Sequence, residues 1–228
     1  MRNGDCHRPR AGRGSTRIDG PMATAVKICG ITRAQDARAA VRFGAHALGF
    51  VFYAGSPRNI GAERAAELVK ELPPFVTTVG LFVNPTASEV KSVLERVRLD
   101  LLQFHGEEPP DFCTQFSTPY IKALRVKVGV DLLQYAQRYA TARGLLLDAF
   151  IEGTHGGTGA VFDWALIPRD LPLPVILSGG LNSANVAAAI RAVAPCAVDV
   201  SSGVEISPGI KDPQKIAAFM KEVRSADV

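Results

Sequence analysis

The chain has 228 residues, of which 47% are hydrophobic and 21% charged, and this balance suits one globular domain or two small ones. It excludes a disordered, collagen-like or coiled-coil organisation for the bulk of the chain, and no run of about 18 apolar residues is present to span a membrane. Four cysteines lie far apart without a C-x-x-C pair, which argues against a disulfide scaffold or zinc finger and fits a reducing compartment. We therefore expect a cytoplasmic protein.

The net charge of +4 is concentrated at the amino terminus, where residues 1–21 hold five arginines against two aspartates. The remaining chain is near neutral and offers no general basic face for nucleic acid. Residues 1–21 nearly lack large apolar side chains and have no apolar signal region, so we expect a disordered basic tail. Apolar patterning begins at Met22, which we interpret as the natural start or the end of a dispensable tail.

Eight short apolar runs follow the tail. They are continuous rather than alternating, as expected for strands buried on both faces. The runs span residues 26–29, 47–52, 77–83, 101–104, 120–126, 144–148, 174–178 and 197–200.

The segments between these runs have the apolar spacing of amphipathic helices. The patterns Thr32-x-x-Gln35 and Thr86-x-x-Glu89 predict capping boxes, and Asp212-Pro213 predicts a helix cap followed by a first-turn proline. The weakest helical patterns lie near residues 109–112 and 162–164.

Eight strand–helix units predict an α/β fold, a single (β/α)8 barrel over residues 22–228. The alternative is a doubly wound open sheet, which usually has fewer strands; the first run is also not followed by G-x-G-x-x-G. Active sites of such barrels lie at the carboxyl ends of the strands. The residues that follow each run are therefore the candidates for function.

Two candidates follow the first runs. Alternation along the first run places Cys29 at the mouth, where it is either a reactive thiol or a small packed core residue. Arg58 lies in a proline-stiffened loop after the second run. It is either a solvated charge or a guanidinium that pairs with a carboxylate or phosphate.

Two further candidates follow later runs. His105 has no second ligand at a matching position, so we predict no metal and favour a hydrogen-bonding role in the pocket wall. Asp148 follows three leucines, and partial desolvation there would favour the protonated acid. An exposed loop aspartate or a helix cap is an equally open interpretation of Asp148. Residues 152–159 form a glycine-rich loop or a flexible linker.

Small residues follow the last two runs. In many (β/α)8 enzymes, backbone amides of these two loops bind phosphate. The pattern thus predicts a small phosphorylated substrate, and the residues concerned are Gly179, Gly180, Ser201, Ser202 and Gly203, beside Asp199.

Taken in order, these motifs resemble the phosphoribosylanthranilate isomerase family of tryptophan biosynthesis. The similarity runs from residue 26 to the carboxyl terminus. Two departures are Ala160, where members often carry lysine, and the tail. The matching motifs are Lys27-Ile-Cys-Gly-Ile-Thr32, Gly49-Phe-Val-Phe52, Ser56-Pro-Arg58, Val79-Gly-Leu-Phe-Val-Asn84, Gln103-Phe-His-Gly106, Leu146-Leu-Asp148, Gly156-Gly-Thr-Gly159, Phe162-Asp-Trp164, Leu177-Ser-Gly-Gly-Leu181, Asn185-Val186, Asp199-Val-Ser-Ser-Gly-Val-Glu205, Pro208-Gly209 and Lys211-Asp212.

The resemblance implies an Amadori rearrangement of N-(5'-phosphoribosyl)anthranilate without a cofactor. It implies that Asp148 is the acid and that Cys29, as a thiolate, is the base. Lys27 or the cationic intermediate would favour the thiolate. Arg58 would bind the anthranilate carboxylate, and the last two loops would bind the phosphate. The oligomeric state is left as monomer or homodimer.

Other barrel functions fit the residues less well. Indole-glycerol-phosphate synthase would need a catalytic lysine and glutamate at inner strand ends, and would leave Cys29 and Asp148 unexplained. A bifunctional histidine–tryptophan isomerase would use an aspartate where Cys29 stands. A ribulose-phosphate epimerase would need several metal ligands. A non-catalytic phosphosugar-binding barrel would keep the phosphate loops without needing an acid and a base.

Overall fold

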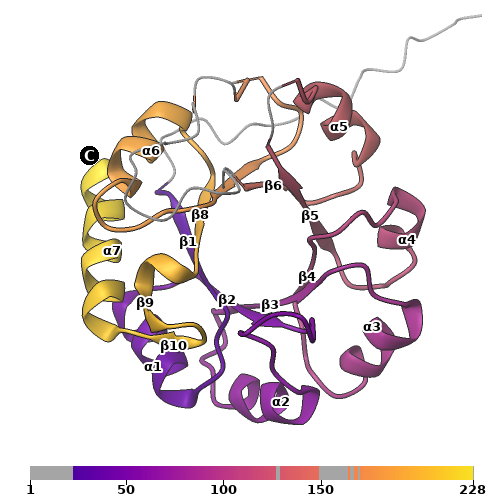
Figure 1. Cartoon of the computed structure of the whole chain (residues 1–228), viewed down its shortest axis with the longest axis horizontal. Helices are drawn as coiled ribbons and strands as arrows, with labels where there is room; N and C mark the ends of the chain where they lie inside the picture. Colours follow the sequence, from indigo (N-terminus) through magenta and orange to yellow (C-terminus); the bar gives the residue numbers. More distant parts are fainter. Residues whose placement is uncertain (1–22, 127–128, 149–163, 165–166, 169, 228) are drawn as a thin grey trace, which may run out of the picture.

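Eight parallel strands pair in chain order and close into a barrel, with β8 hydrogen-bonded to β1. The computed structural model describes residues 23–126, 129–148, 164, 167–168 and 170–227. Figure 1 looks down the ring of strands, which the helices surround. The predicted (β/α)8 fold is confirmed, and each predicted strand boundary lies within one residue of the observed one. The strands are β1 (Ala25–Cys29), β2 (Ala47–Val51), β3 (Thr77–Phe82), β4 (Leu101–Phe104), β5 (Tyr120–Arg125), β6 (Leu145–Asp148), β7 (Val175–Ser178) and β8 (Ala197–Val200).

The helices largely follow the predicted segments, and two of their three predicted caps are confirmed. Thr86 and Glu89 form a reciprocal capping box, and Asp212 accepts backbone hydrogen bonds at the start of the last helix. The tail and residues 162–163 of a predicted weak helix lie outside the described residues. The helices are α1 (Ala34–Phe43), α2 (Ala62–Lys70), α3 (Ala87–Leu94), α4 (Pro110–Thr114), α5 (Leu132–Arg138), α6 (Val186–Val193) and α7 (Pro213–Ala226).

The predicted capping box at Thr32 is wrong. Helix α1 begins at Ala34 after Arg33, and no side chain caps it. The Thr32 hydroxyl instead donates to the carbonyl oxygen of Gly209 at 2.6 Å. The Thr32 hydroxyl therefore bonds a residue that is distant in sequence instead of capping the helix that the local pattern predicted.

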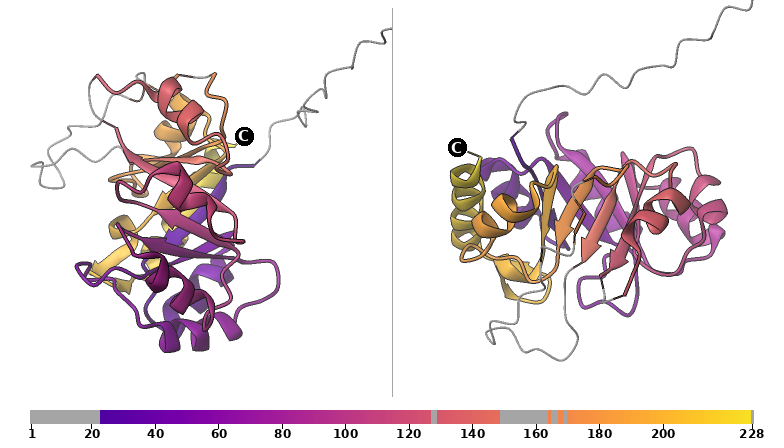
Figure 2. Two further views of the ribbon diagram at one scale, coloured as in Figure 1. Left: turned by 90° about the vertical axis from the view of Figure 1, so that its right-hand side faces the viewer. Right: turned by 90° about the horizontal axis from the view of Figure 1, so that it is seen from above.

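A short antiparallel hairpin after β8 was not predicted. A 3₁₀ turn, η2 (Ser202–Val204), leads into β9 (Glu205–Ser207), which pairs with β10 (Ile210–Lys211). Gly209 makes the tight turn possible with a φ of 80°, a conformation that other residues rarely adopt. Figure 2 shows the hairpin at one end of the barrel, beyond the strand that leads to it.

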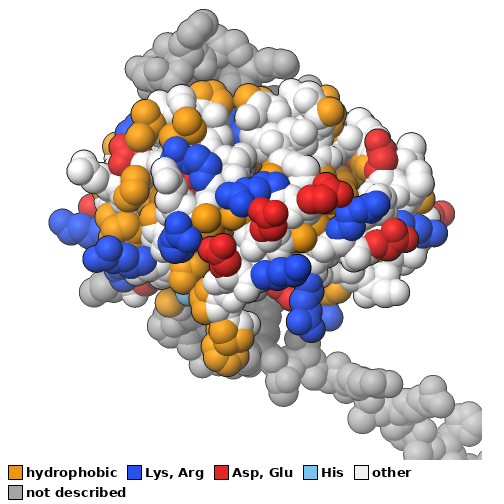
Figure 3. All heavy atoms as spheres, turned by 90° about the horizontal axis from the view of Figure 1, so that it is seen from below, with side chains coloured by type: hydrophobic (Ala, Val, Ile, Leu, Met, Phe, Trp, Pro, Cys, Tyr) orange, Lys and Arg blue, Asp and Glu red, His pale blue; other side chains and the backbone are white. Residues whose placement is uncertain are grey.

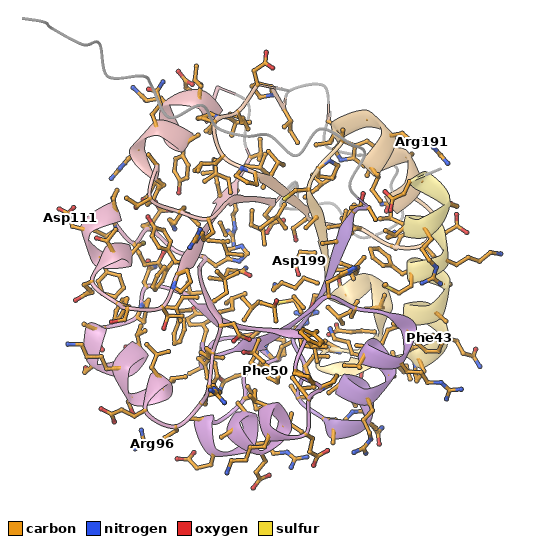
Figure 4. All side chains as sticks on the ribbon, turned by 180° about the vertical axis from the view of Figure 1, so that it is seen from behind. Phe43, Phe50, Arg96, Asp111, Arg191 and Asp199 are labelled. Carbon is orange, nitrogen blue, oxygen red and sulfur yellow. The ribbon has the colours of Figure 1, made fainter. Side chains whose placement is uncertain are left out.

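The two faces of each strand carry different side chains. Outward residues such as Phe50, Phe82 and Phe104 are fully buried beneath the helices and form the main core. Inward residues form two small apolar clusters and include buried polar groups, among them Lys27 and Asp199. Figure 4 shows Asp199 inside the ring of strands. The alternation that builds the core therefore also delivers polar groups to the barrel interior.

A buried ion pair that the sequence analysis did not predict lies in the outer core. The Lys122 ammonium on β5 lies 2.8 Å from Glu108 Oε2 and also donates to the carbonyl oxygens of Phe104 and Gly106. Glu108 Oε1 accepts from the backbone N–H groups of Asn84 and Gly106. These bonds tie together the segments that follow β3 and β4.

The outer surface carries charges of both signs. On the face shown in Figure 3, basic and acidic side chains are interspersed rather than gathered by sign. Among the described residues, no helix is both long enough and apolar enough to cross a membrane.

Candidate active site

A pocket of about 430 Å³ opens at the carboxyl ends of the strands. Its lining includes nine of the ten residues that the sequence singled out, which the barrel brings together from six of its eight strand ends: Cys29, Arg58, His105, Asp148, Gly179, Gly180, Asp199, Ser201 and Ser202. The location of these residues agrees with a role in binding or catalysis. Their individual roles remain predictions.

Gly203 is the predicted site residue that does not line the pocket. A Cβ at Gly203 would collide with the backbone carbonyl of Leu181 in the loop after β7. The missing side chain thus lets the turn after β8 lie against the loop after β7. Within the described part of the chain, the backbone N–H groups of Gly179, Gly180, Ser202 and Gly203 have no protein acceptor. Two adjacent loops therefore present amide donors, the groups that bind phosphate oxygens.

Cys29 lies at the end of β1 beside a buried ion pair. Lys27 lies two residues earlier on the same face of β1. Its ammonium is 2.8 Å from Asp199 Oδ1, and both side chains are 6% exposed. Burial opposes the charge of Lys27, but Asp199 and Cys29 raise the pKa of the ammonium above its usual value. Lys27 therefore stays charged next to the thiol.

Burial raises the pKa of the Cys29 thiol, and Asp199 raises it further, whereas the positive charges of Lys27 and Lys211 oppose the rise. The thiol is therefore the stable form near neutral pH. An additional positive charge near Sγ is needed before the thiolate predominates.

The residue beside the thiol on the neighbouring strand has no side chain. Gly49 pairs with Cys29 in the neighbouring strand, and a Cβ there would lie 2.8 Å from Cys29 Sγ. Such a contact is closer than carbon and sulfur atoms tolerate, so glycine leaves room for the thiol to face the pocket.

On the opposite wall, His105 at the end of β4 faces Asp148 at the end of β6. His105 Nε2 lies 3.4 Å from Asp148 Oδ2, and both side chains are 18% exposed. The other ring nitrogen of His105 lies 3.0 Å from the side-chain amide nitrogen of Gln103. Asp148 is thus partly shielded from water and placed beside an imidazole.

Arg58 is held in place by Glu205. The carboxylate of Glu205 accepts hydrogen bonds from Nε and Nη2 of Arg58 at 2.9 and 2.7 Å. It also accepts one from the Lys211 ammonium at 2.8 Å. Burial alone would raise the pKa of Glu205, but the hydrogen bonds from Arg58 and Lys211 hold it below its usual value. Glu205 also raises the pKa of Arg58, despite partial burial of that guanidinium.

Glu205 and Lys211 are site-forming residues to which the sequence reasoning gave no role. Both lie in the hairpin, six positions apart and on either side of Pro208-Gly209. A carboxylate and an ammonium that flank a Pro-Gly turn are a detectable hairpin signal. Lys211 also donates to Ser201, whose hydroxyl donates to the carbonyl oxygen of Cys29. The hairpin thereby connects Arg58 to the strand that carries the thiol.

The pocket combines a thiol, a partly shielded carboxyl group, a guanidinium and amide-rich loops at the carboxyl end of a parallel barrel. This is the arrangement of a (β/α)8-barrel enzyme that moves protons on a small anionic substrate.

Comparison with known proteins makes the assignment specific. The family model described as N-(5'-phosphoribosyl)anthranilate (PRA) isomerase matches residues 26–222. The isomerase of Nitrosospira multiformis is 59% identical over 202 residues, which cover 89% of this chain and 97% of that protein. The crystal structure of the isomerase from Thermotoga maritima has a TM-score of 0.82 and 44% identity, and the match covers 89% of this chain and 99% of that one.

A further solved isomerase, 43% identical with a TM-score of 0.79, was crystallised with reduced 1-(o-carboxyphenylamino)-1-deoxyribulose 5-phosphate; 89% of this chain and 99% of that one are covered. The chain belongs to the N-(5'-phosphoribosyl)anthranilate isomerase family. It is an isomerase of tryptophan biosynthesis and catalyses an aldose–ketose (Amadori) rearrangement.

Proposed function

We propose that Asp148 is the general acid and Cys29 the general base of this isomerisation. Asp148 gives its proton to the furanose ring oxygen while the anthranilate nitrogen pushes open the C1–O bond, which leaves a cationic iminium. Cys29 then removes the proton from C2, and the resulting enolamine tautomerises to the ketone. The observation that carries the proposal is that one pocket is lined by both groups, which lie on β1 and β6.

The burial of Cys29 suits the order of these steps. Burial raises the pKa of the thiol, so Cys29 becomes an effective base when an additional positive charge comes close to it. The iminium supplies that charge after Asp148 has acted. Lys27, which remains charged beside Cys29, acts in the same direction. The nitrogen of the substrate serves as the electron sink, so the proposed steps use no cofactor.

We propose that the two ends of the substrate bind to separate parts of the pocket. Arg58 binds the anthranilate carboxylate through the edge of its guanidinium that Glu205 leaves open. His105 and Asp199 line the middle of the pocket, while the loops after β7 and β8 bind the phosphate through their backbone amides. The phosphorylated, carboxylate-bearing ligand of the solved relative has both of these ends.

The test is loss of substrate fluorescence with two conservative variants. Cys29→Ser and Asp148→Asn should each lower kcat by about 100- to 10,000-fold, the usual effect of losing a general base or acid. Cys196→Ser and Asp111→Asn are the matched controls, since these two exposed residues lie outside the pocket lining. Near wild-type kcat for Cys29→Ser would return Cys29 to the status of a packed residue.

Alkylation provides a second test that needs no change at Cys29. In a Cys6→Ser/Cys196→Ser background, an alkylating reagent should abolish activity, and a bound product analogue should protect it. Cys113 is fully buried and does not line the pocket, whereas Cys29 does, so a reagent that enters the pocket reaches Cys29 and not Cys113. Full activity after modification of Cys29 would contradict the proposed base.

We also propose that residues 22–228 form the catalytic domain, which acts in the cytoplasm as a monomer or homodimer. The T. maritima relative is described as dimeric. In this chain Phe75, before β3, is 96% exposed, and it is the position at which we test the homodimer. Light scattering on the wild type and on Phe75→Ser measures the mass, and a wild-type monomer at high concentration would exclude the dimer.

A further inference from the structure

A buried amide lies next to the proposed acid. Gln103 on β4 is fully buried and faces the barrel interior between its apolar register neighbours, Leu81 and Ile121. Its Nε2 lies 3.0 Å from His105 Nδ1. Among the described residues, Gln103 Oε1 is the buried side-chain polar atom that has no hydrogen-bond partner. A glutamine thus occupies this buried position although its side-chain oxygen has no hydrogen-bond partner among the described residues.

The orientation of this amide determines where His105 carries its proton. An amide nitrogen only donates, so Nδ1 of His105 must accept, and the proton of the neutral imidazole is then on Nε2. The reversed amide would place Oε1 against Nδ1 and leave the NH₂ group, with its two hydrogens, unpartnered among Leu81 and Ile121. The observed orientation leaves Oε1 and one N–H without a partner, whereas the reversed one would leave both N–H groups without one. Orphaned buried N–H groups are rarer in proteins than under-satisfied oxygens, which favours the Nε2–H form of His105.

The Nε2–H group then faces Asp148. His105 Nε2 lies 3.4 Å from Asp148 Oδ2, a separation that catalytic hydrogen bonds commonly shorten when substrate binds. A donor directed at a carboxyl group stabilises the negative charge that develops as the proton leaves. A His105 with its proton on Nδ1 would instead direct a lone pair at that charge.

We propose that Gln103 is a positioning residue that locks His105 in its Nε2–H form, so that the imidazole donates to Asp148 as Asp148 releases its proton. The inference rests on the proposed role of Asp148 as the acid. One proton moves, from Asp148 to the ring oxygen of the substrate. His105 and Gln103 keep their protons throughout.

Other titratable and charged groups lie in or beside the same pocket, and a Gln103 variant replaces none of them. The NMR form of His105 is therefore measured beside the pH profile, so that a change at His105 is separated from a change at these groups. The groups are Arg125 on β5, Lys27 and Cys29 on β1, Asp199 on β8 and Arg58 after β2.

The first test uses the wild-type protein. Nitrogen-15 NMR of the imidazole rings at neutral pH distinguishes a protonated ring nitrogen from an unprotonated one, and His105→Asn assigns the signals among the four histidines of the chain. We expect His105 to have an unprotonated Nδ1 and a protonated Nε2. A wild-type His105 with its proton on Nδ1 would overturn the proposal, whatever the variants do.

The second test replaces the amide. Gln103→Leu should mix the two forms of His105 in the NMR spectrum and lower kcat by about 2- to 12-fold, the loss of one hydrogen bond, with little change in KM. It should also move the limbs of the kcat pH profile. Gln103→Glu places an acceptor at Nδ1, so that Nδ1 gains a proton. Gln134→Leu, on the exposed side of α5, is the matched control.

A purely structural role gives a different result. Gln103→Leu would then lower Tm but leave the His105 form and the pH profile as in the wild type, and the proposal would be wrong. If Gln103→Leu fails to fold, the wild-type spectrum still decides. If Asp148→Asn remains active, Asp148 is not the acid, and the hydrogen bond from His105 has no role in catalysis. If Asp148→Asn is inactive but His105 of the wild type carries its proton on Nδ1, the inference about Gln103 is wrong while the proposed role of Asp148 stands.

Discussion

Glu205 binds one edge of the Arg58 guanidinium through two hydrogen bonds of 2.9 and 2.7 Å, and its side chain is only 4% exposed. A bidentate pair of this kind fixes the plane of the guanidinium as well as its position. Arg58 therefore presents its remaining edge to the pocket in a defined orientation. A residue on the hairpin after β8 thus orients the guanidinium of a residue in the loop after β2.

Arg58→Ala should weaken substrate binding by about 2–3 kcal/mol, because a charge-assisted contact with the carboxylate is lost in a partly dry pocket. The effect should appear in KM and in affinity for a product analogue, while inorganic phosphate binds as before. Arg64→Ala is the control, since Arg64 pairs on the surface with Glu67. Reduced phosphate affinity with an unchanged KM would place Arg58 at the phosphate end.

Glu205→Gln should flatten the acid limb of the stability curve. The folded-state pKa of Glu205 lies below its usual value, so its ion pairs stabilise the fold above the unfolded pKa of about 4.3. That stabilisation is lost as the pH falls through the lower folded-state pKa. Urea unfolding from pH 7 to pH 3 should show a smaller acid loss in Glu205→Gln than in the wild type. Parallel curves for the two proteins would refute the assignment.

Lys122→Met should destabilise the barrel by about 3–5 kcal/mol, because it leaves the Glu108 carboxylate buried without its cation. Denaturant midpoints measure the loss, and Lys221→Met on the exposed side of α7 is the control. Adding Glu108→Gln to Lys122→Met should restore part of the stability. If the single variant unfolds like the wild type, the pair contributes little and the surrounding apolar core holds these loops.

Removal of residues 1–21 should leave turnover and the unfolding midpoint nearly unchanged, because the segment lacks apolar anchors. The comparison is between the full chain and a chain that starts at Met22, under identical conditions. A clear fall in kcat for the shorter chain would assign the segment to the site or the fold.

The barrel could be predicted from the sequence because strands that are buried on both faces have nearly continuous apolar sequences. The sequence also identified the strand-end residues, because the order of strands determines which loops meet. It could not predict partners that are distant in sequence. Thr32 has the local pattern of a helix cap, yet its hydroxyl binds Gly209. Lys122 interrupts an apolar run, and nothing local announces that Glu108 neutralises it.

Gly49 on β2 determines how much room the thiol on β1 has. Any side chain at that position would push against the sulfur of Cys29 and the aliphatic stem of Lys27, where an added Cβ would lie 2.8 and 3.1 Å from the nearest atoms. The position of the Cys29 thiol therefore depends on the absence of a side chain on the neighbouring strand, and a larger residue at position 49 would displace it.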